Sequence, residues 1–337
     1  MILETGKLDS ELLKKIVFGK ITYRSDDVKV RPGIGEDCAV MGFGDYDCIM
    51  STDPISSAVN DIGRLAIHIT CNDIASNGVQ PLGIMLAVML PVGTTDEDVE
   101  MIMTQAGQTA DELKVEIIGG HTEITPAVNQ PVIVSTAIGK APEGVSQSGN
   151  DMVPGDIIMM TKGIGLEGTG IIACDYEEKL REAKDENGNR ILSDEEIEEA
   201  KTFLDRVSVV AEGVAAGKIG THGMHDITEG GILGAVWEMC QIAGVGADVW
   251  QKSIHMEPQT EKICKLFDIN PLRLISSGAM VIIVPADRKN LMLDAIKAIG
   301  VEPFIIGKIM EPSFGIKMDG KEIDPPYADE IYKVVGK

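Results

Sequence analysis

Side chains that could bind a divalent cation recur at three places in the first quarter of the sequence. Carboxylate and amide oxygens are the ligands that Mg²⁺ and Ca²⁺ prefer in proteins. The first place follows a turn in which Gly35 permits close approach of the backbone to a ligand. The second follows an apolar run and the third lies in an amphipathic segment. The residues are Glu36, Asp37, Asp53, Asp73 and the neighbouring amide Asn72.

Asp73 has the strongest argument of these residues. The spacing of apolar residues predicts a helix over 62–77, and Ile62, Ala66 and Ile69 share a face with this carboxylate. A carboxylate on a buried face costs free energy unless it is paired or bound to a metal. The alternative is a structural hydrogen bond near the end of the helix, and Asp73 alone leaves both interpretations open.

A glycine pair follows the short apolar run 115–118. Gly119 and Gly120 could present backbone N–H groups to a phosphate, and His121 and Thr122 add an imidazole and a hydroxyl. An ordinary hairpin turn is the alternative interpretation, because the same residue types suit both.

The second half of the chain contains the motif HGMHDITEGG at 222–231. Gly230 and Gly231 open an apolar helix, and the N-terminus of a helix favours an anion. His222 and His225 have the spacing of an H-x-x-H zinc pair. No other soft ligand stands nearby in the sequence, so we favour the interpretation without zinc.

The elements that must position these residues alternate between apolar runs and amphipathic segments. This pattern predicts an α/β (α+β) fold of two domains, 1–145 and 155–337, because the Pro-, Gly- and Ser-rich stretch 141–156 is typical of a boundary. The expected strands are 37–41, 47–53, 82–90, 115–118, 131–138, 157–161, 279–284 and 303–306. The expected helices are 8–19, 62–77 with Asn60 or Asp61 as its cap, about 94–114, 230–243 and 287–299.

The segment 175–206 consists almost entirely of charged and polar residues. We interpret it as a solvated helical hairpin rather than as a binding surface. Within it, Ser193 and Glu196 have the spacing of a capping box, which predicts a helix that runs on towards Val214.

Composition excludes several classes of partner. The chain has 337 residues and a formal net charge of -23. That balance argues against nucleic acid and against an anionic membrane surface. We see no signal peptide, and the longest apolar run, 83–90, is too short to cross a bilayer, so we expect a cytoplasmic protein. None of the six cysteines forms a C-x-x-C pair, so we expect reduced, packed thiols.

The order, spacing and flanking sequences of these motifs resemble one family over nearly the whole chain. It contains aminoimidazole ribonucleotide (AIR) synthetase, formylglycinamidine synthetase, thiamine-monophosphate kinase, selenophosphate synthetase and the carbamoyl dehydratase HypE of hydrogenase maturation. The resemblance is closest to the HypE type. The segments that carry it are 33–40, 61–75 and 222–231.

This resemblance implies an AIR-synthase-like fold. Its first domain pairs with its twin in a homodimeric β-barrel, its second is an α/β sandwich, and ATP lies at the interface. Glu36 or Asp37, Asp53 and Asp73 would hold Mg²⁺, while His121 and Asp226 would be catalytic. The residues that would contact the cofactor are Gly35, Asn72, Gly119, Gly120, Thr122, Gly230 and Gly231.

The implied activity is ATP-dependent activation of an amide or carbonyl oxygen, or phosphorylation of a small metabolite. The metal would offset the charge of both carboxylates and phosphates, so an acidic chain can bind ATP. A direct kinase like the thiamine-monophosphate enzyme is a third interpretation. It is disfavoured by His121, because that chemistry depends on several metals.

Three departures from the family pattern leave the reaction open. His121 stands where relatives have an acid, and imidazole is a poor ligand for Mg²⁺. His225 and Glu229 stand where HypE enzymes have arginines, which changes the anion that this place could hold. HypE carries its substrate group on a terminal cysteine, whereas the last cysteine here is Cys264, so we do not expect that reaction on this chain's own tail. The alternative is an accessory ATP-binding protein in hydrogenase or metallocofactor maturation, and the substrate is an unidentified small molecule or protein tail.

Overall fold

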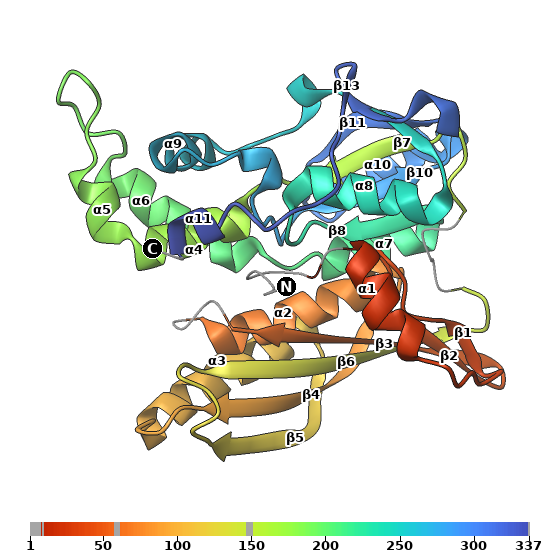
Figure 1. Cartoon of the computed structure of the whole chain (residues 1–337), viewed down its shortest axis with the longest axis horizontal. Coiled ribbons are helices and arrows are strands. Elements are labelled where there is room, and N and C mark those ends of the chain that lie inside the picture. Colours follow the sequence, from red (N-terminus) through yellow and green to blue (C-terminus); the bar gives the residue numbers. More distant parts are fainter. Residues whose placement is uncertain (1–7, 9, 57–60, 146–150, 336–337) are drawn as a thin grey trace.

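The computed structural model describes residues 8, 10–56, 61–145 and 151–335. Within them the chain forms two sheets, one in each half of the sequence, with helices around them (Figure 1). This mixed α/β architecture agrees with the fold class expected from the sequence.

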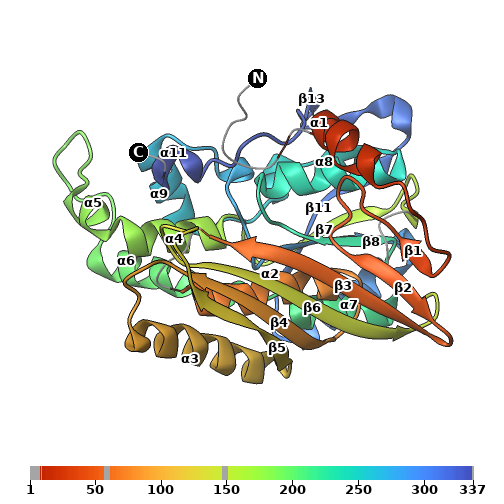
Figure 2. The ribbon, with the colours of Figure 1, turned by 60° about the horizontal axis from the view of Figure 1, so that its bottom comes forward.

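The first sheet has six strands and consists of residues from the first half of the chain. Most neighbouring strands are antiparallel, but β4 and β5 are parallel because α3 (Asp96–Leu113) connects them. Figures 1 and 2 show α2 (Ile62–Ser76) and α3 on the same side of this sheet. In spatial order its strands are β1 (Val28–Val30), β2 (Ala39–Phe43), β3 (Tyr46–Ile55), β6 (Val132–Pro142), β4 (Pro81–Leu90) and β5 (Glu116–Ile124).

The second sheet has seven strands and lies in the second half. The charged helices α5 (Glu177–Glu182) and α6 (Asp194–Lys201) project from one end of this half (Figure 1), as expected for a solvated segment. Its strands in spatial order are β13 (Lys321–Glu322), β12 (Ile316–Met318), β9 (Gly246–Val249), β11 (Pro303–Met310), β7 (Ile157–Thr161), β10 (Met280–Val284) and β8 (Gly223–Asp226). The other helices are α1 (Ser10–Ile16), α4 (Leu166–Asp175), α7 (Val210–Ile219), α8 (Gly231–Ala243), α9 (Pro258–Phe267), α10 (Lys289–Ala298) and α11 (Tyr332–Val335).

Helix α2 lies between the two halves. It packs on β3 and β6 of its own sheet and on α7 and β8 of the other half. Fourteen of its fifteen residues are buried, so the helix is enclosed on all sides rather than amphipathic. The polar residues of this helix therefore face either the first sheet or the second half of the chain, and both surroundings are low in water.

Most predicted elements are confirmed within a few residues. Helix α3 lies within the expected range of about 94–114, and Thr95 caps it with a capping box. Asp61 is the N-cap of α2, although its side chain makes no capping hydrogen bond, and the other candidate cap, Asn60, lies outside the described residues. The expected helix 8–19 is shorter, because α1 ends at Ile16.

Two predictions about element ends were wrong. The strand expected at 115–118 continues through the glycine pair to Ile124, so the pair is not a turn. Ser193 does begin a helix with a capping box, but that helix ends at Lys201 instead of running towards Val214. Residues 207–209 are not helical because the Asn72 side chain accepts a hydrogen bond from the Val209 N–H and donates one to the Val207 carbonyl.

Among the described residues, no helix combines the length and the apolar composition that a membrane crossing requires. All six cysteines are free thiols, and Cys38, Cys71, Cys240 and Cys264 are buried. The expectation of packed thiols is thus confirmed for these four, whereas Cys48 and Cys174 are only half-buried.

Candidate functional site

Asp73 lies near the C-terminal end of α2, where its carboxylate is buried against β3. The Ser51 hydroxyl donates a hydrogen bond of 2.5 Å to its Oδ2. Burial raises the pKa of Asp73 well above its usual range, and the nearby charges of Asp53, Asp226 and Asp37 raise it further. The expected burial of Asp73 is confirmed, because it is only 4% exposed, although almost every residue of α2 is buried whichever face it lies on. The protein therefore holds a carboxylate where ionisation is unfavourable without a compensating cation.

Asp226 reaches the same region from the other half of the chain, at the end of β8. Its backbone N–H donates to the Ser76 hydroxyl of α2 at 3.2 Å, and the carboxylate is fully buried. Burial, followed by the charge of Asp37, raises the pKa of Asp226 to about 7. Within the described part of the chain, its Oδ2 has no hydrogen-bond partner. A carboxyl group in this state exchanges a proton near neutral pH.

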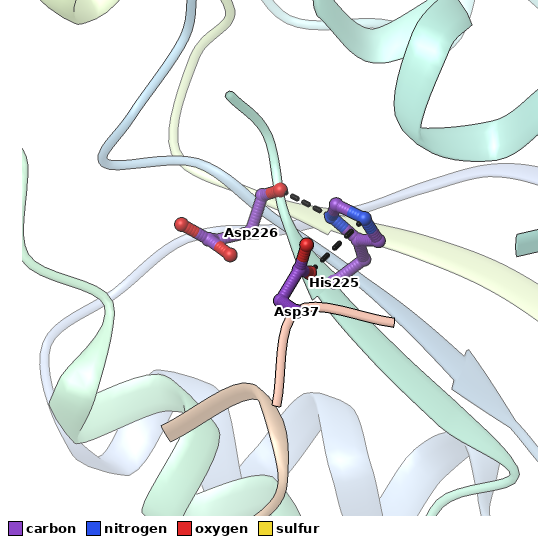
Figure 3. A group of neighbouring side chains, drawn as sticks. All are labelled: Asp37, His225 and Asp226. Carbon is purple, nitrogen blue, oxygen red and sulfur yellow. Dashed lines mark hydrogen bonds and ion pairs between the residues drawn. The ribbon is translucent and has the colours of Figure 1, made fainter. Parts of the chain in front are cut away.

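His225 and Asp37 face one another across the two halves (Figure 3). The Nε2 atom of His225 lies 3.2 Å from Asp37 Oδ2 and 3.8 Å from Glu238 Oε2. Its Nδ1 lies 2.5 Å from the Asp226 carbonyl oxygen. Burial lowers the pKa of His225, but the charges of Asp37, Glu238 and Asp226 outweigh that effect and the pKa is raised.

The four carboxylates Asp37, Asp53, Asp73 and Asp226 thus converge where α2 meets β8. No Lys or Arg in the described ranges forms an ion pair with any of them, and the one basic partner of Asp37 is a histidine. Asp73 and Asp226 are buried, whereas Asp37 and Asp53 are partly exposed. Crowded acids without a basic partner are the donor set that a divalent cation stabilises. The site residues fit a divalent metal by this criterion.

A small cavity of about 20 Å³ adjoins this cluster, bounded among others by Glu36, Asp37 and His225. Gly35 sits at its edge in a left-handed conformation, with φ of 73°. This conformation is strained for any other residue, and a Cβ at Gly35 would also approach Ile242 Cδ1 of α8 to 2.8 Å. Asp37, rather than Glu36, joins the group around His225 and Asp226, and both remain predicted metal ligands.

Asn72 points away from this cluster. Its side-chain N–H donates a hydrogen bond to the Val207 carbonyl, and its Oδ1 accepts one from the Val209 N–H, both at 2.8 Å. These two bonds give Asn72 a structural role between the two halves. Cofactor binding by Asn72 stays a prediction.

The glycine pair of the second half lies at the N-terminus of α8, as predicted. Gly230 and Gly231 both have positive φ, 87° and 61°. The Gly230 N–H donates to Asp329 Oδ2 at 2.7 Å. One of the N–H groups that could bind a ligand anion at this helix end is therefore already bonded to a carboxylate of the chain itself. The Glu229 carboxylate accepts a hydrogen bond from the Tyr332 hydroxyl at 2.6 Å.

Four predicted residues, His121 with Gly119, Gly120 and Thr122, are not brought to the carboxylates within this chain. They belong to β5, which lies three strands from β3, or about 14 Å at usual sheet spacing. His121 pairs in register with Ala87 on the sheet face opposite α2, and its side chain is 71% exposed. Their predicted roles in cofactor binding and catalysis stay predictions.

Sequence reasoning missed several polar residues at the cluster. Ser76 follows Asp73 by three positions and could have been found as a neighbour on the same helix. Glu238 comes close to His225 only through folding of the second half, and no local pattern predicts it. Cys38, which donates from Sγ to the Asp73 carbonyl at 3.3 Å, was expected only to be packed.

Comparisons with known proteins identify the family. The model of the AIR synthase related protein N-terminal domain matches residues 35–141, and that of the C-terminal domain matches residues 153–318. A Methanocaldococcus jannaschii protein, provisionally named a hydrogenase expression/formation protein, is 28% identical and covers 98% of this chain and 97% of its own length. The carbamoyl dehydratase HypE of Rhizobium leguminosarum bv. viciae is 30% identical, over 78% of this chain and 73% of its own.

Solved structures agree with this assignment at the level of the fold. The structure of a HypE–HypF complex matches with a TM-score of 0.73 and 22% identity, over 93% of this chain and 99% of the other. HypE in complex with ATP matches with a TM-score of 0.69 and 19% identity, over 97% of both chains. From its two matched domains and its relatives, this chain belongs to the AIR synthase related protein family.

Proposed function

We propose that this protein is a Mg-ATP-dependent enzyme that activates an amide or carbonyl oxygen, or phosphorylates a small metabolite. The observation that carries the proposal is the convergence of Asp37, Asp53, Asp73 and Asp226 without a Lys or Arg partner in the described ranges. It is supported by a relative named as a carbamoyl dehydratase and by a related fold solved with ATP. The domains proposed for this activity are 1–145 and 155–337, close to the limits of the two family models.

In this proposal Asp37 or Glu36, Asp53 and Asp73 hold Mg²⁺. When bound, the metal offsets the negative charge of the ATP phosphates and of the phosphoryl group in transfer. Ser51 keeps the Asp73 carboxylate in one orientation through its hydrogen bond of 2.5 Å. The burial of Asp73 keeps water from competing for the same oxygen atoms.

Asp226 is the proposed proton-transfer residue. A general acid or base works best with a pKa near the working pH, and the pKa of Asp226 is raised to about 7. The backbone N–H of Asp226 donates a hydrogen bond of 3.2 Å to the Ser76 hydroxyl, which holds Asp226 against α2. It could receive a proton from a substrate amide or hydroxyl and return it to the departing oxygen.

We further propose that two copies of the chain pair through the first sheet. The face opposite α2 carries apolar side chains, of which Met85 and Ile118 are 42% and 48% exposed. His121 lies on that same face, in register with Ala87. A second sheet packed there would cover the apolar residues and bring His121 into the interface, where the family resemblance puts ATP.

The experiment is an ATP hydrolysis assay with the full chain and Mg²⁺, with and without a panel of carboxamides and small carbonyl or phosphate metabolites. We expect slow hydrolysis alone and faster hydrolysis with one class of compound. Asp226→Asn should lower the stimulated rate by about 10²- to 10⁴-fold, as loss of acid–base catalysis does.

The second candidate is an accessory ATP-binding protein of hydrogenase or metallocofactor maturation. It is favoured by the name of the Methanocaldococcus jannaschii relative, a hydrogenase expression/formation protein, and by the similarity to HypE in a HypE–HypF complex. ATP binding without turnover under every condition of the assay would support this candidate and contradict the proposed enzyme.

A further inference from the structure

A groove in the second half of the chain lies apart from the carboxylate site. Its volume is about 620 Å³, which is within the range of pockets that hold small molecules. The short 3-10 helix η4 (Gln251–Ser253) and the residues after it form one part of its wall, and α10 and the start of β11 form the rest. Neither α2 nor β8 contributes a lining residue, so the groove is separate from the place where the four carboxylates converge.

The groove differs from the rest of the protein in its charge. The sequence has 53 Asp and Glu against 30 Lys and Arg, but none of the described residues that line the groove is acidic. Lys252 is exposed at its edge, and its ammonium group forms no ion pair within the described part of the chain. An anion in this groove would therefore meet a cation without a competing carboxylate in the wall.

Three polar groups in the groove lack partners inside the protein. They are the Lys252 ammonium, the Ser253 hydroxyl and the His255 ring nitrogens, which form no hydrogen bond with any described residue. An ammonium and a hydroxyl both donate to phosphate or carboxylate oxygens, and an imidazole donates from whichever nitrogen carries the hydrogen. Because all three come from positions 252–255, one anionic group can contact more than one of them.

Two stacked rings form the other chemical feature of the groove. The rings of His255 and Phe304 are parallel to within 8°, and their centroids are 4.6 Å apart. This stack fixes the orientation of the imidazole, and flat aromatic rings, including nucleotide bases, stack well on such surfaces. The apolar lining includes Ile254, Met256 and Leu293, which favours a ligand with an apolar ring.

We infer that this groove is a second ligand site, for a small molecule that joins a flat aromatic ring to an anionic group, as a nucleoside monophosphate does. The ring stacks beside His255 and Phe304, and the anion accepts hydrogen bonds from Lys252 and Ser253. Binding needs no metal ion, because no carboxylate of the wall repels the phosphate. The inference does not depend on the proposed function, since the groove shares no residue with the Mg²⁺ site.

The test is calorimetric titration of AMP into the full chain in the presence of EDTA. Adenosine, which has the ring without the anion, and ribose 5-phosphate, which has the anion without the ring, are titrated separately. We expect one AMP per chain and affinities at least about tenfold lower for each of the two fragments, because each lacks either the charged hydrogen bonds or the stacking. Equal affinity for AMP and for either fragment would contradict the inferred ligand class.

Two variants locate the binding in the groove. Lys252→Gln should lower the affinity for AMP at least about fivefold and leave that for adenosine unchanged. His255→Ala should weaken both, because it removes the stacked ring. The matched control is Lys321→Gln, which removes the same charge from an exposed position on β13 outside the groove and should bind AMP as the wild type does.

Absence of AMP binding in EDTA, or equal AMP affinity in Lys252→Gln and the wild type, would overturn the inference. Loss of AMP binding in Asp73→Asn would also overturn it, because it would put AMP in the carboxylate site. We expect Asp73→Asn to lose Mg-ATP binding and to keep AMP binding in EDTA. A wild type that binds AMP but no Mg-ATP would contradict the proposed function alone.

Discussion

Glu167 shows how strongly burial acts on single carboxylates in this protein. It lies in the first turn of α4, is 5% exposed, and burial raises its pKa from 4.5 to about 7. The folded state therefore binds this proton more tightly than the unfolded state does. The stabilisation that results is fully present below pH 4.5 and is lost as the pH rises through 7.

The pH dependence of stability tests this point. At about 1.4 kcal/mol per pKa unit, Glu167 should lower the free energy of unfolding by about 3 kcal/mol between pH 4.5 and pH 8. Glu167→Gln removes the titrating group, so its stability should fall less over this range in urea unfolding at both pH values. The control is Glu182→Gln, a change at an exposed residue of α5. Equal pH dependence in Glu167→Gln and the wild type would contradict the account.

Strand β5 illustrates how an element can require glycine without a turn. Gly120 has a φ of 147°, and a Cβ there would lie 1.9 Å from the Leu86 carbonyl oxygen of β4. Gly120→Ala should therefore lower the free energy of unfolding by about 2–4 kcal/mol. Gly107 is the control: it lies in α3 with open space around its Cα, so Gly107→Ala should stabilise by up to about 1 kcal/mol. Thermal and urea unfolding measure the stability of both variants. Equal changes in the free energy of unfolding would contradict the claim that the close approach of Gly120 to β4 requires glycine.

The elements of this protein could be predicted from sequence where their patterns are local. The period of apolar residues was sufficient for α2 and β4, and the capping box predicted at Ser193 was correct. Predictions failed where a distant partner decides the conformation. Gly120 continues a strand that pairs with β4, and the chain after α6 is not one helix up to Val214, since Asn72 bonds to the backbone at 207 and 209.

At the scale of the whole molecule, Asn72 joins the two halves. Its amide makes two buried hydrogen bonds of 2.8 Å to the backbone on either side of Ser208. Asn72→Ala would leave a buried N–H without a partner, so we expect a loss of about 2–4 kcal/mol in urea unfolding. Asn77→Ala, which removes a single bond of 3.4 Å, should cost less than about 1 kcal/mol. A small effect of Asn72→Ala on stability, combined with lost ATP binding, would favour the cofactor role instead.

The candidate site forms only where the two halves pack together. The sequence could therefore indicate single site residues but not which of them meet. Asp73 was found because an acid on an apolar helix face is anomalous. The approach of Asp37 to His225 and Asp226 joins positions almost two hundred residues apart, and only the fold brings them together. His121 was expected in the same site, but within one chain its strand β5 is three strands from β3 and its side chain is on the sheet face opposite α2.

We propose that two chains pair because His121 lies on the sheet face that points away from the carboxylates of its own chain. Met85→Glu puts a charge on the exposed apolar face of the first sheet, and sedimentation should then show monomers where the wild type shows dimers. Leu291→Glu is the control, because Leu291 is 56% exposed on α10 in the other half. A monomeric wild type, or a dimer that survives Met85→Glu, would contradict pairing through this face.

The most direct test of the central claim is calorimetric titration of ATP into the full chain with and without Mg²⁺, repeated with Asp73→Asn. The account predicts saturable binding by the wild type only when Mg²⁺ is present, and affinity at least about tenfold lower in the variant. The variant should unfold at an unchanged or higher temperature, because burial already disfavours the charge of Asp73 and asparagine can accept the Ser51 hydrogen bond. Absence of ATP binding by the wild type, or binding that is equal without Mg²⁺ and in Asp73→Asn, would contradict a metal-dependent ATP site.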